Sequence, residues 1–121
     1  MSSTPIRHFR TAYVPQNSGH DLTALKDLCD KIVFCSTGYE AEAELPQAIE
    51  QAMKEFDPRK DIIVPVGNVT SNFLVGMVAQ KMMLPYEAYL ENVPCVSMAI
   101  YRDKAYTVRD VLLGADNGSQ D

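Results

Sequence analysis

The sequence predicts a small α/β domain in which a parallel β-sheet core is followed by a C-terminal β-hairpin. The chain has 121 residues, of which 46% are hydrophobic, and this suits one soluble domain but is too short for two. Stretches with strand spacing and with helical spacing follow one another in the order βαβαβα, which implies parallel strands and right-handed crossovers. We expect a three-layer sandwich of about five strands, Rossmann-like or flavodoxin-like by analogy. The domain should span residues 1–113, with residues 114–121 as a flexible tail.

The first strand and the first helix are predicted from a change in the spacing of apolar residues. Apolar and polar side chains alternate over residues 8–14, which is typical of a strand, and Pro15 ends it. Over residues 21–31 the apolar positions fall at helical spacing. We therefore expect a short helix there, with Ser18 as its capping residue.

The second strand and the second helix are predicted next. The compact apolar run at residues 32–35 predicts a strand that is buried on both faces. Three glutamates and Pro46 then mark a helix start, because acidic side chains complement the helix dipole and proline needs no amide partner there. Pro58 ends this helix, whose apolar positions recur every three or four residues: Leu45, Ile49, Met53 and Phe56.

The third strand and the third helix form the most apolar part of the chain. Residues 61–66 predict another buried strand, although Pro65 cannot donate to a sheet and prefers a strand end. Residues 69–83 predict a helix whose apolar side chains cover nearly its whole circumference. Such a helix lies at the centre of a core or is also covered by a partner. Pro85 and Pro94 should bound an irregular connection after it.

A hairpin is predicted at the C-terminal end, with strands over residues 96–101 and 106–111. Its connection contains Asp103 and Lys104, which do not form the favoured Asp-Gly turn. A three-stranded parallel core is small for its class, so we expect a homodimer formed through the hairpin or the third helix. Tyrosines contribute strongly to the binding energy of interfaces, and methionines adapt to irregular surfaces. The methionines could also fill gaps in a small core. The predicted interface residues are Met77, Met82, Tyr101 and Tyr106.

The charge of the chain argues against two classes of partner. Eleven lysines and arginines against sixteen aspartates and glutamates give a net charge of −5. Nucleic acid and anionic membranes need a basic face, so we expect neither as a partner. The longest apolar stretch, residues 73–84, is shorter than the roughly 20 residues that span a bilayer. Residues 1–11 also lack the apolar core of a signal peptide, and we expect a cytoplasmic protein.

The cysteines and histidines match no common metal or redox motif. Cys29, Cys35 and Cys95 are odd in number and have no C-x-x-C spacing, which favours reduced, buried thiols. His8 and His20 lie far from any cysteine pair, so no metal site is expected. The chain also lacks phosphate-loop, dinucleotide-binding and hydrolase motifs. The sequence therefore predicts no cofactor and favours binding over catalysis.

Three predicted strand-to-helix loops should meet at the carboxyl ends of the strands, where open α/β sheets bind ligands. The loops cover residues 15–20, 36–40 and 67–72, and they combine glycines with polar side chains but contain no lysine or arginine. Glycines and helix N-termini favour a nucleotide-like molecule or another small anion as the ligand. The alternative is that the glycines shape turns, and that the polar side chains only cap helices or satisfy backbone groups. The candidate ligand-binding residues are Asn17, His20, Thr37, Gly38, Gly67, Asn68 and Asn72.

The sequence offers two catalytic candidates but no motif that joins them. His20 could act as a general acid or base, and Glu40 in the neighbouring loop could pair with it. His20 could equally be a surface residue, and Glu40 could belong to a solvated acidic helix start. Three functions stay open: a small-ligand binding protein, a protein–protein interaction module, and a hydrolase that uses these two residues. By analogy only, an interaction module could be a small accessory or inhibitory factor, including a phage-encoded one, that acts on a cellular protein.

Overall fold

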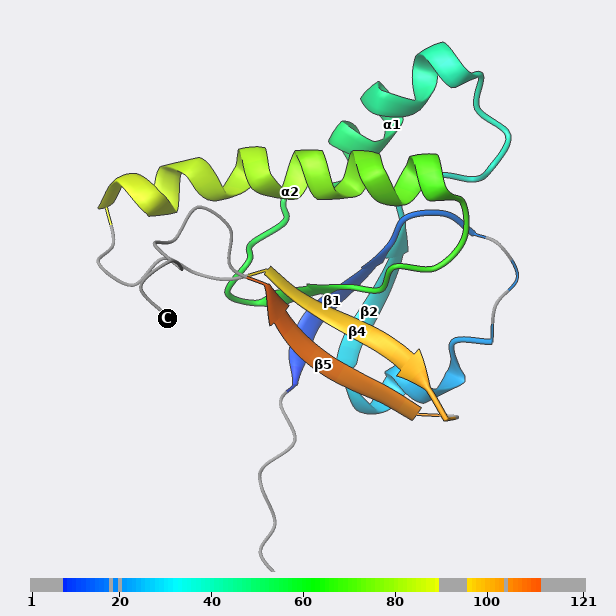
Figure 1. The fold of residues 1–121 in the computed structure, drawn as a ribbon, viewed down its shortest axis with the longest axis vertical. Helices are drawn as coiled ribbons and strands as arrows, with labels where there is room; N and C mark the ends of the chain where they lie inside the picture. The colour runs from blue at the N-terminus through cyan, green and yellow to red at the C-terminus, as the bar shows by residue number, and fades with distance from the viewer. Residues whose placement is uncertain (1–7, 18, 20, 90–95, 104, 112–121) are drawn as a thin grey trace, which may run out of the picture.

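The computed structural model of the chain describes residues 8–17, 19, 21–89, 96–103 and 105–111. Its strands are β1 (Phe9–Val14), β2 (Cys29–Phe34), β3 (Asp61–Ile63), β4 (Val96–Arg102) and β5 (Ala105–Val111). They form one mixed sheet in the order β2-β1-β3-β4-β5, and helices pack on it, so the chain has an α/β fold (Figure 1). Neighbouring strands from β2 to β4 are parallel, whereas β5 pairs with β4 in the antiparallel direction.

Strand β1 lies between β2 and β3, and most of its side chains are buried. The alternation over residues 8–14 predicted this strand correctly, and Pro15 follows its last residue. Strand β3 is shorter than predicted. The Val64 N–H still donates to the Tyr13 carbonyl over 2.9 Å, but the ladder ends before Pro65, which has no N–H to offer.

The helix predicted over residues 21–31 is only a short 3₁₀ helix, η1 (Thr23–Asp27). The Asp21 carboxylate accepts hydrogen bonds from the Thr23 N–H at 3.0 Å and the Thr23 hydroxyl at 2.6 Å, and these bonds order the start of η1. Residues 29–31 pair with β1 and belong to β2, because sheet hydrogen bonds outcompete helix extension there. Ser18, the predicted cap, lies outside the described residues.

The prediction that β2 is buried on both faces is wrong. This strand forms one edge of the sheet and has β1 as its single neighbour among the described strands. Asp30 and Lys31 are exposed, and 42% of the Phe34 surface is open to solvent. Charged side chains on an edge strand discourage pairing with another chain, and this explains why Asp30 and Lys31 suit the edge position of β2.

The second helix forms as the acidic start, Pro46 and the apolar spacing predict, although it is shorter. A 3₁₀ turn, η2 (Glu42–Glu44), leads directly into α1 (Leu45–Ala52), which ends well before Pro58. Pro46 occupies the first turn, where its missing N–H leaves no partner unsatisfied. Of the four apolar positions at helical spacing, Ile49, Met53 and Phe56 are buried and Leu45 is half-buried.

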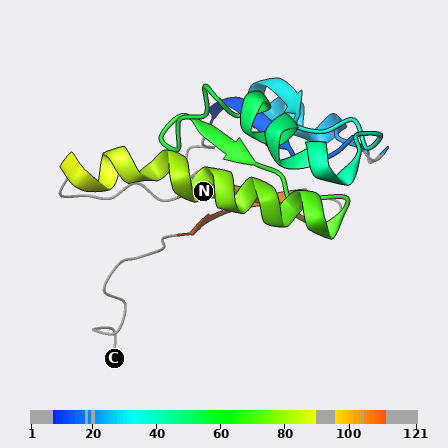
Figure 2. The same ribbon diagram turned by 90° about the horizontal axis from the view of Figure 1, so that it is seen from above.

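The third helix, α2 (Val69–Tyr89), is longer than predicted because it continues through Pro85. With 21 residues it is about 32 Å long, and its last turns run past the strands (Figures 1 and 2). The irregular connection expected between Pro85 and Pro94 is therefore helical up to Tyr89, and residues 90–94 lie outside the described part of the chain.

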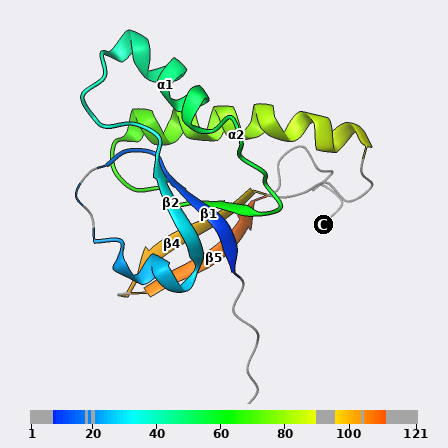
Figure 3. The same cartoon turned by 180° about the vertical axis from the view of Figure 1, so that it is seen from behind.

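Two apolar clusters lie on opposite faces of the sheet. On one face, α1 and α2 pack side by side over a cluster that includes Tyr13, Ile63 and Val75. On the other face, η1 covers a cluster that includes Val14 and Ile62, and it lies beside β2 (Figure 3). The predicted third layer is thus reduced, among the described residues, to one short 3₁₀ helix.

Strands β4 and β5 form the predicted hairpin at the opposite edge of the sheet. Asp103, in the connection, has φ 54°, and aspartate tolerates this left-handed conformation better than most residues. The rings of Tyr101 and Tyr106 lie 5.0 Å apart beside the turn and hold the hairpin end together.

An ion pair between the half-exposed Arg10 and the buried Asp61 joins β1 to the start of β3, at the amino ends of these strands. The Arg10 guanidinium donates to both carboxylate oxygens of Asp61, at 3.0 and 2.8 Å, and Asp61 is 0% exposed. The same carboxylate accepts the Asp57 N–H at 2.8 Å, so its buried charge is compensated. Burial and the nearby Asp61 charge raise the pKa of Tyr13 to about 12.

Candidate functional site

A polar pocket lies where the sheet reverses its strand order. Because β2 and β3 lie on opposite sides of β1, the connections that leave β1 and β3 run in opposite directions, and a depression lies at the carboxyl ends of these strands. The depression has a volume of about 190 Å³. We call it the polar pocket, and it is lined by Gln16, Ser36, Gly38, Glu40, Glu42, Leu45, Asn68, Thr70 and Ser71.

The loop after β2 folds around the carboxylate of Glu40. One carboxylate oxygen accepts the Ser36 hydroxyl at 2.8 Å and the Gly38 N–H at 3.2 Å, and the other accepts the Thr37 N–H at 3.1 Å. These hydrogen bonds, chiefly those to the Thr37 N–H and the Ser36 hydroxyl, lower the pKa of Glu40 to about 2. The carboxylate therefore stays ionised at neutral pH.

The position of Glu40 changes what this loop can bind. Backbone N–H groups in such a turn would otherwise be free to hold a phosphate or carboxylate from a ligand. Here a carboxylate of the chain itself takes that place, and Glu42 adds a second negative charge to the pocket lining. Among the described residues, no lysine or arginine lines the pocket.

Gln16 connects the three loops of the pocket. It follows Pro15 at the end of β1, and its side-chain oxygen accepts the hydroxyl of Ser71 in α2 at 3.1 Å. Its amide nitrogen packs over Gly38, so close that a Cβ atom there would meet it at 3.0 Å. The next residue, Asn17, donates its N–H to the Ser36 carbonyl at 3.1 Å. One side chain thus fixes the distance between the loop after β2 and the start of α2.

Helix α2 begins at the opposite wall of the pocket. The Asn68 side-chain oxygen accepts the Ser71 N–H at 3.1 Å, so Asn68 acts as a helix cap. Thr70 lies in the first turn and also lines the pocket. The wall therefore presents hydroxyl groups together with the positive end of the helix dipole.

The structure brings together only some of the predicted ligand-binding residues. Gly38 and Asn68 line the polar pocket, and Thr37 contributes its N–H to the turn around Glu40. Asn17 and Gly67 are exposed and do not line the pocket. His20 lies outside the described residues.

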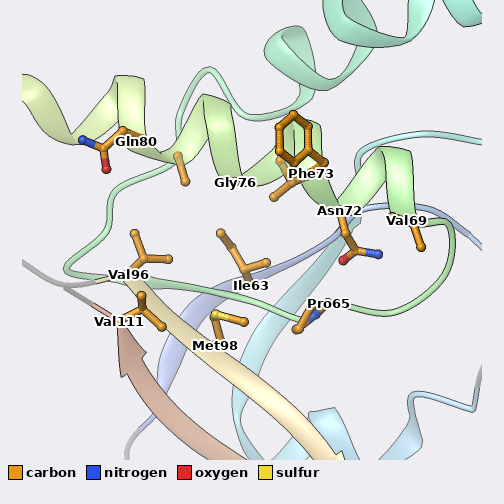
Figure 4. A pocket seen from close by; sticks show the side chains of 12 residues that line it. Ile63, Pro65, Val69, Asn72, Phe73, Gly76, Gln80, Val96, Met98 and Val111 are labelled. Atoms are coloured by element: carbon orange, nitrogen blue, oxygen red, sulfur yellow. The ribbon is translucent and has the colours of Figure 1, made fainter. Parts of the chain in front are cut away.

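Asn72 faces a different space. Asn68 precedes α2 as its cap and lines the polar pocket, whereas Asn72 lies within the helix and does not line that pocket. The Asn72 amide nitrogen donates to the carbonyls of Asn68 at 2.8 Å and Val66 at 3.2 Å. Its side chain lines an apolar cavity between α2 and the strands (Figure 4).

Sequence reasoning missed several residues that line the polar pocket. Gln16, Ser36, Thr70 and Ser71 all lie within the three predicted loops, but they were not singled out there. Their position directly after a strand or in the first turn of a helix was the available signal. Glycines and asparagines drew attention to the loops, whereas hydroxyls and one glutamine supply most of the pocket's polar groups.

The described residues contain little that supports catalysis. A carboxyl group with a pKa of about 2 is a poor proton acceptor at neutral pH, which weakens the proposed role of Glu40. Burial raises the pKa of the Cys35 thiol to about 12 and also raises that of Cys29, so both thiols are protonated at neutral pH. Cys95 lies outside the described residues. The described part of the chain holds no group of three metal-ligating side chains.

The predicted interface residues differ in their exposure. Met77 and Tyr101 are 54% and 52% exposed, so their side chains are available to a partner. Met82 and Tyr106 are half-buried and pack against the two apolar clusters of the fold. None of the helices within the described ranges combines the length and apolar content that crossing a membrane requires.

Comparison of the chain with protein-family models, curated proteins and solved structures gives no match.

Proposed function

We propose that this chain binds a small polar molecule in the polar pocket, without chemical turnover. The observation that carries the proposal is the position of the pocket at the reversal of strand order, between the carboxyl ends of β1, β2 and β3. The strand order 2-1-3-4-5 is that of flavodoxin-like sheets, which bind their ligand next to the first and third strands. The antiparallel β5 departs from that arrangement, so the similarity is one of strand order.

The chemistry of the pocket favours a ligand that donates hydrogen bonds. Glu40 already occupies the N–H groups that an anion would need, and Glu42 repels a second anion. A neutral polyol or an ammonium group would instead find acceptors in both carboxylates and in the hydroxyls of the loops. A nucleotide-like or other anionic ligand, which the loop composition suggests, would have to bind at the N-terminus of α2 alone.

Two matched variants of the 3₁₀ turn before α1 test this proposal. Glu42 lines the pocket, whereas Glu44 does not. Both side chains are exposed, and the substitution to glutamine leaves the size of each nearly unchanged. Thermal-shift measurements would compare ribose, spermidine, inorganic phosphate and adenosine monophosphate as ligands. We expect spermidine or ribose to raise the melting temperature, and E42Q to weaken the spermidine effect several-fold while E44Q does not. Equal effects of the two variants, or stabilisation by phosphate alone, would contradict the proposal.

A second candidate function is protein–protein interaction, and one surface feature favours it. Val69, Phe73 and Met77 follow one another at four-residue spacing along α2 and are 82%, 67% and 54% exposed. Val69 and Phe73 stand at the rim of the apolar cavity between α2 and the strands, which they also line. Such a stripe suits a second copy of the chain or the target of an accessory or inhibitory factor. Light scattering after size exclusion tests self-association: a mass of twice 13.5 kDa that falls to 13.5 kDa in F73Q would support it. A monomer at every concentration would exclude the homodimer.

A further inference from the structure

The apolar cavity between α2 and the strands is separate from the polar pocket and more than twice its volume. It has a volume of about 420 Å³, against about 190 Å³ for the polar pocket, and it is open to solvent on one side. Helix α2 forms one wall, and residues from β3, β4 and β5 form the other (Figure 4). No charged side chain lines it within the described part of the chain. Its volume lies in the range of cavities that hold small molecules.

Two side-chain oxygens in this cavity have no hydrogen-bond partner. They are Oδ1 of Asn72 and Oε1 of Gln80, both shielded from solvent and both turned toward the cavity in Figure 4. The orientation of the Asn72 amide is fixed, because its nitrogen donates to the carbonyls of Val66 and Asn68. Rotating that amide would place its oxygen against two carbonyl oxygens. The unpartnered acceptor is therefore a stable feature of this wall.

Buried acceptors without a donor are unfavourable and uncommon in folded proteins, so a pair in one cavity calls for an explanation. The two residues are eight positions apart on α2, which corresponds to about 12 Å along the helix axis. Donor groups at the two ends of one elongated molecule would satisfy both oxygens. The apolar lining between them would contact the middle of that molecule.

Gly76 lies between these two residues and also lines the cavity. A Cβ atom at Gly76 would meet nothing within 4 Å, so the packing of the chain does not require glycine there. Glycine is disfavoured inside a helix, and its presence leaves free space at the cavity wall. A ligand that approaches the helix backbone closely would use that space.

We infer that this cavity binds a neutral, elongated and mainly apolar molecule with a hydroxyl or N–H donor at each end. Asn72 and Gln80 accept the two terminal hydrogen bonds, and the apolar side chains of Ile63, Val96 and Met98 contact the middle. The absence of charge in the described lining selects against anionic and cationic ligands. This site is independent of the ligand proposed for the polar pocket.

The probe for this inference is para,para′-dihydroxybiphenyl, a rigid apolar rod with a hydroxyl group at each end. Its matched control is para,para′-difluorobiphenyl, which has nearly the same shape but no donor. Isothermal titration calorimetry on the full chain should show tighter binding of the dihydroxy compound. Each hydrogen bond should contribute about five-fold in Kd, or about 1 kcal/mol, so two bonds should give about twenty-five-fold. Equal affinity for the two compounds, or no binding of either, would overturn the inference.

Two variants on α2 locate the bound probe. A Cβ atom at Gly76 meets nothing within 4 Å, so G76L places an apolar side chain in the free space of the cavity, and it should abolish binding while the helix still forms. Q80M removes one unpartnered acceptor, so it should raise the melting temperature and weaken the dihydroxy probe about five-fold. Q47M on the exposed side of α1 is the control and should change neither quantity.

The outcomes of these variants separate the cavity from other binding places. Unchanged probe affinity in G76L and Q80M would place the probe elsewhere and refute the site. Amide NMR spectra of the free chain that show the cavity already filled, by another part of the chain or by a second copy, would also refute it. Tighter binding of the probe by the parent chain than by both variants, with the Q47M affinity unchanged, supports it.

Discussion

Replacing Gly38 with alanine adds one methyl group at the centre of the polar pocket, and the structure allows its effect to be worked out in steps. Gly38 has φ +92°, and an L-residue held in such a conformation costs about 1–2 kcal/mol. The new Cβ would lie 3.0 Å from the amide nitrogen of Gln16, which must then move. A shift of a few tenths of an ångström strains the 3.1 Å hydrogen bond between Gln16 and Ser71, whose complete loss would cost about 1 kcal/mol.

Alanine also restricts the unfolded chain, which returns about 0.4–1 kcal/mol of stability. We therefore expect G38A to lower the free energy of unfolding by about 2 kcal/mol. Two alanine variants separate these contributions. Gly19 has φ +81° and nothing within 4 Å among the described atoms, so G19A carries the backbone strain alone and should cost about 1 kcal/mol. Gly76 lies inside α2 with open space around it, so G76A should stabilise the chain by about 1 kcal/mol.

Urea denaturation of the three variants, followed by circular dichroism, measures these differences directly. All three make the same chemical change, so effects on the unfolded state are matched. The difference between G38A and G19A isolates the contact with Gln16. If G38A is no less stable than G19A, Gln16 does not hold the loops together and the description of the pocket is wrong.

Three further predictions concern the pocket turn, the ion pair and the core. The pKa of Glu40 in the folded chain is about 2, below the ordinary value of about 4.3. Its ionised carboxylate therefore stabilises the fold above about pH 4, and this stabilisation is lost as the pH falls toward 2. E40Q should therefore show a smaller loss of stability than the parent chain between pH 5 and pH 2, and identical pH profiles in urea denaturation would refute this. R10M leaves the buried Asp61 carboxylate without its partner and should lower the free energy of unfolding by about 2 kcal/mol. This is less than the roughly 3–5 kcal/mol lost when a fully buried pair is broken, because Arg10 is 45% exposed. R10K keeps the positive charge and should lower the free energy of unfolding less than R10M does. I49A removes a fully buried side chain of α1 and should cost about 3 kcal/mol in the same assay, while a loss under 1 kcal/mol would mean that α1 is loosely packed.

Local patterns were sufficient to predict the elements that rely on neighbouring residues. Alternation placed β1 and the hairpin strands, and the glutamates before Pro46 placed the start of α1. The predicted secondary structure was wrong where hydrogen bonds to a distant strand determine the backbone conformation. Residues 29–31 fit a helix by spacing, but they join β2 because β1 offers them sheet hydrogen bonds.

The candidate site could be located from the sequence, but its side chains could not be assigned. Parallel strands necessarily bring their carboxyl ends to one edge, so the three loops were correctly placed together. Which side chains turn inward depends on contacts between distant positions, such as the bond between Gln16 and Ser71, which are 55 residues apart. The folding of Glu40 back onto its own loop likewise depends on the local backbone geometry, which spacing does not report.

The polar pocket and the apolar cavity lie on two sides of the first turn of α2 and differ in their chemistry. Thr70 and Ser71 face the polar pocket, while Asn72 and Phe73 line the apolar cavity. A change in the first turn of α2 can therefore affect both sites, and variants for one site are best chosen away from it. Glu42 for the polar pocket and Gln80 for the apolar cavity meet this condition.

The proposed function depends most directly on which ligands reach the polar pocket, and chemical-shift mapping measures this. Amide spectra of the labelled full chain would be recorded with spermidine, ribose, inorganic phosphate and adenosine monophosphate. We predict shifts at Ser36, Gly38 and Ser71 with spermidine or ribose, and none at these amides with phosphate or the nucleotide. Shifts at the three amides with phosphate or the nucleotide alone, or with none of the four compounds, would contradict the account.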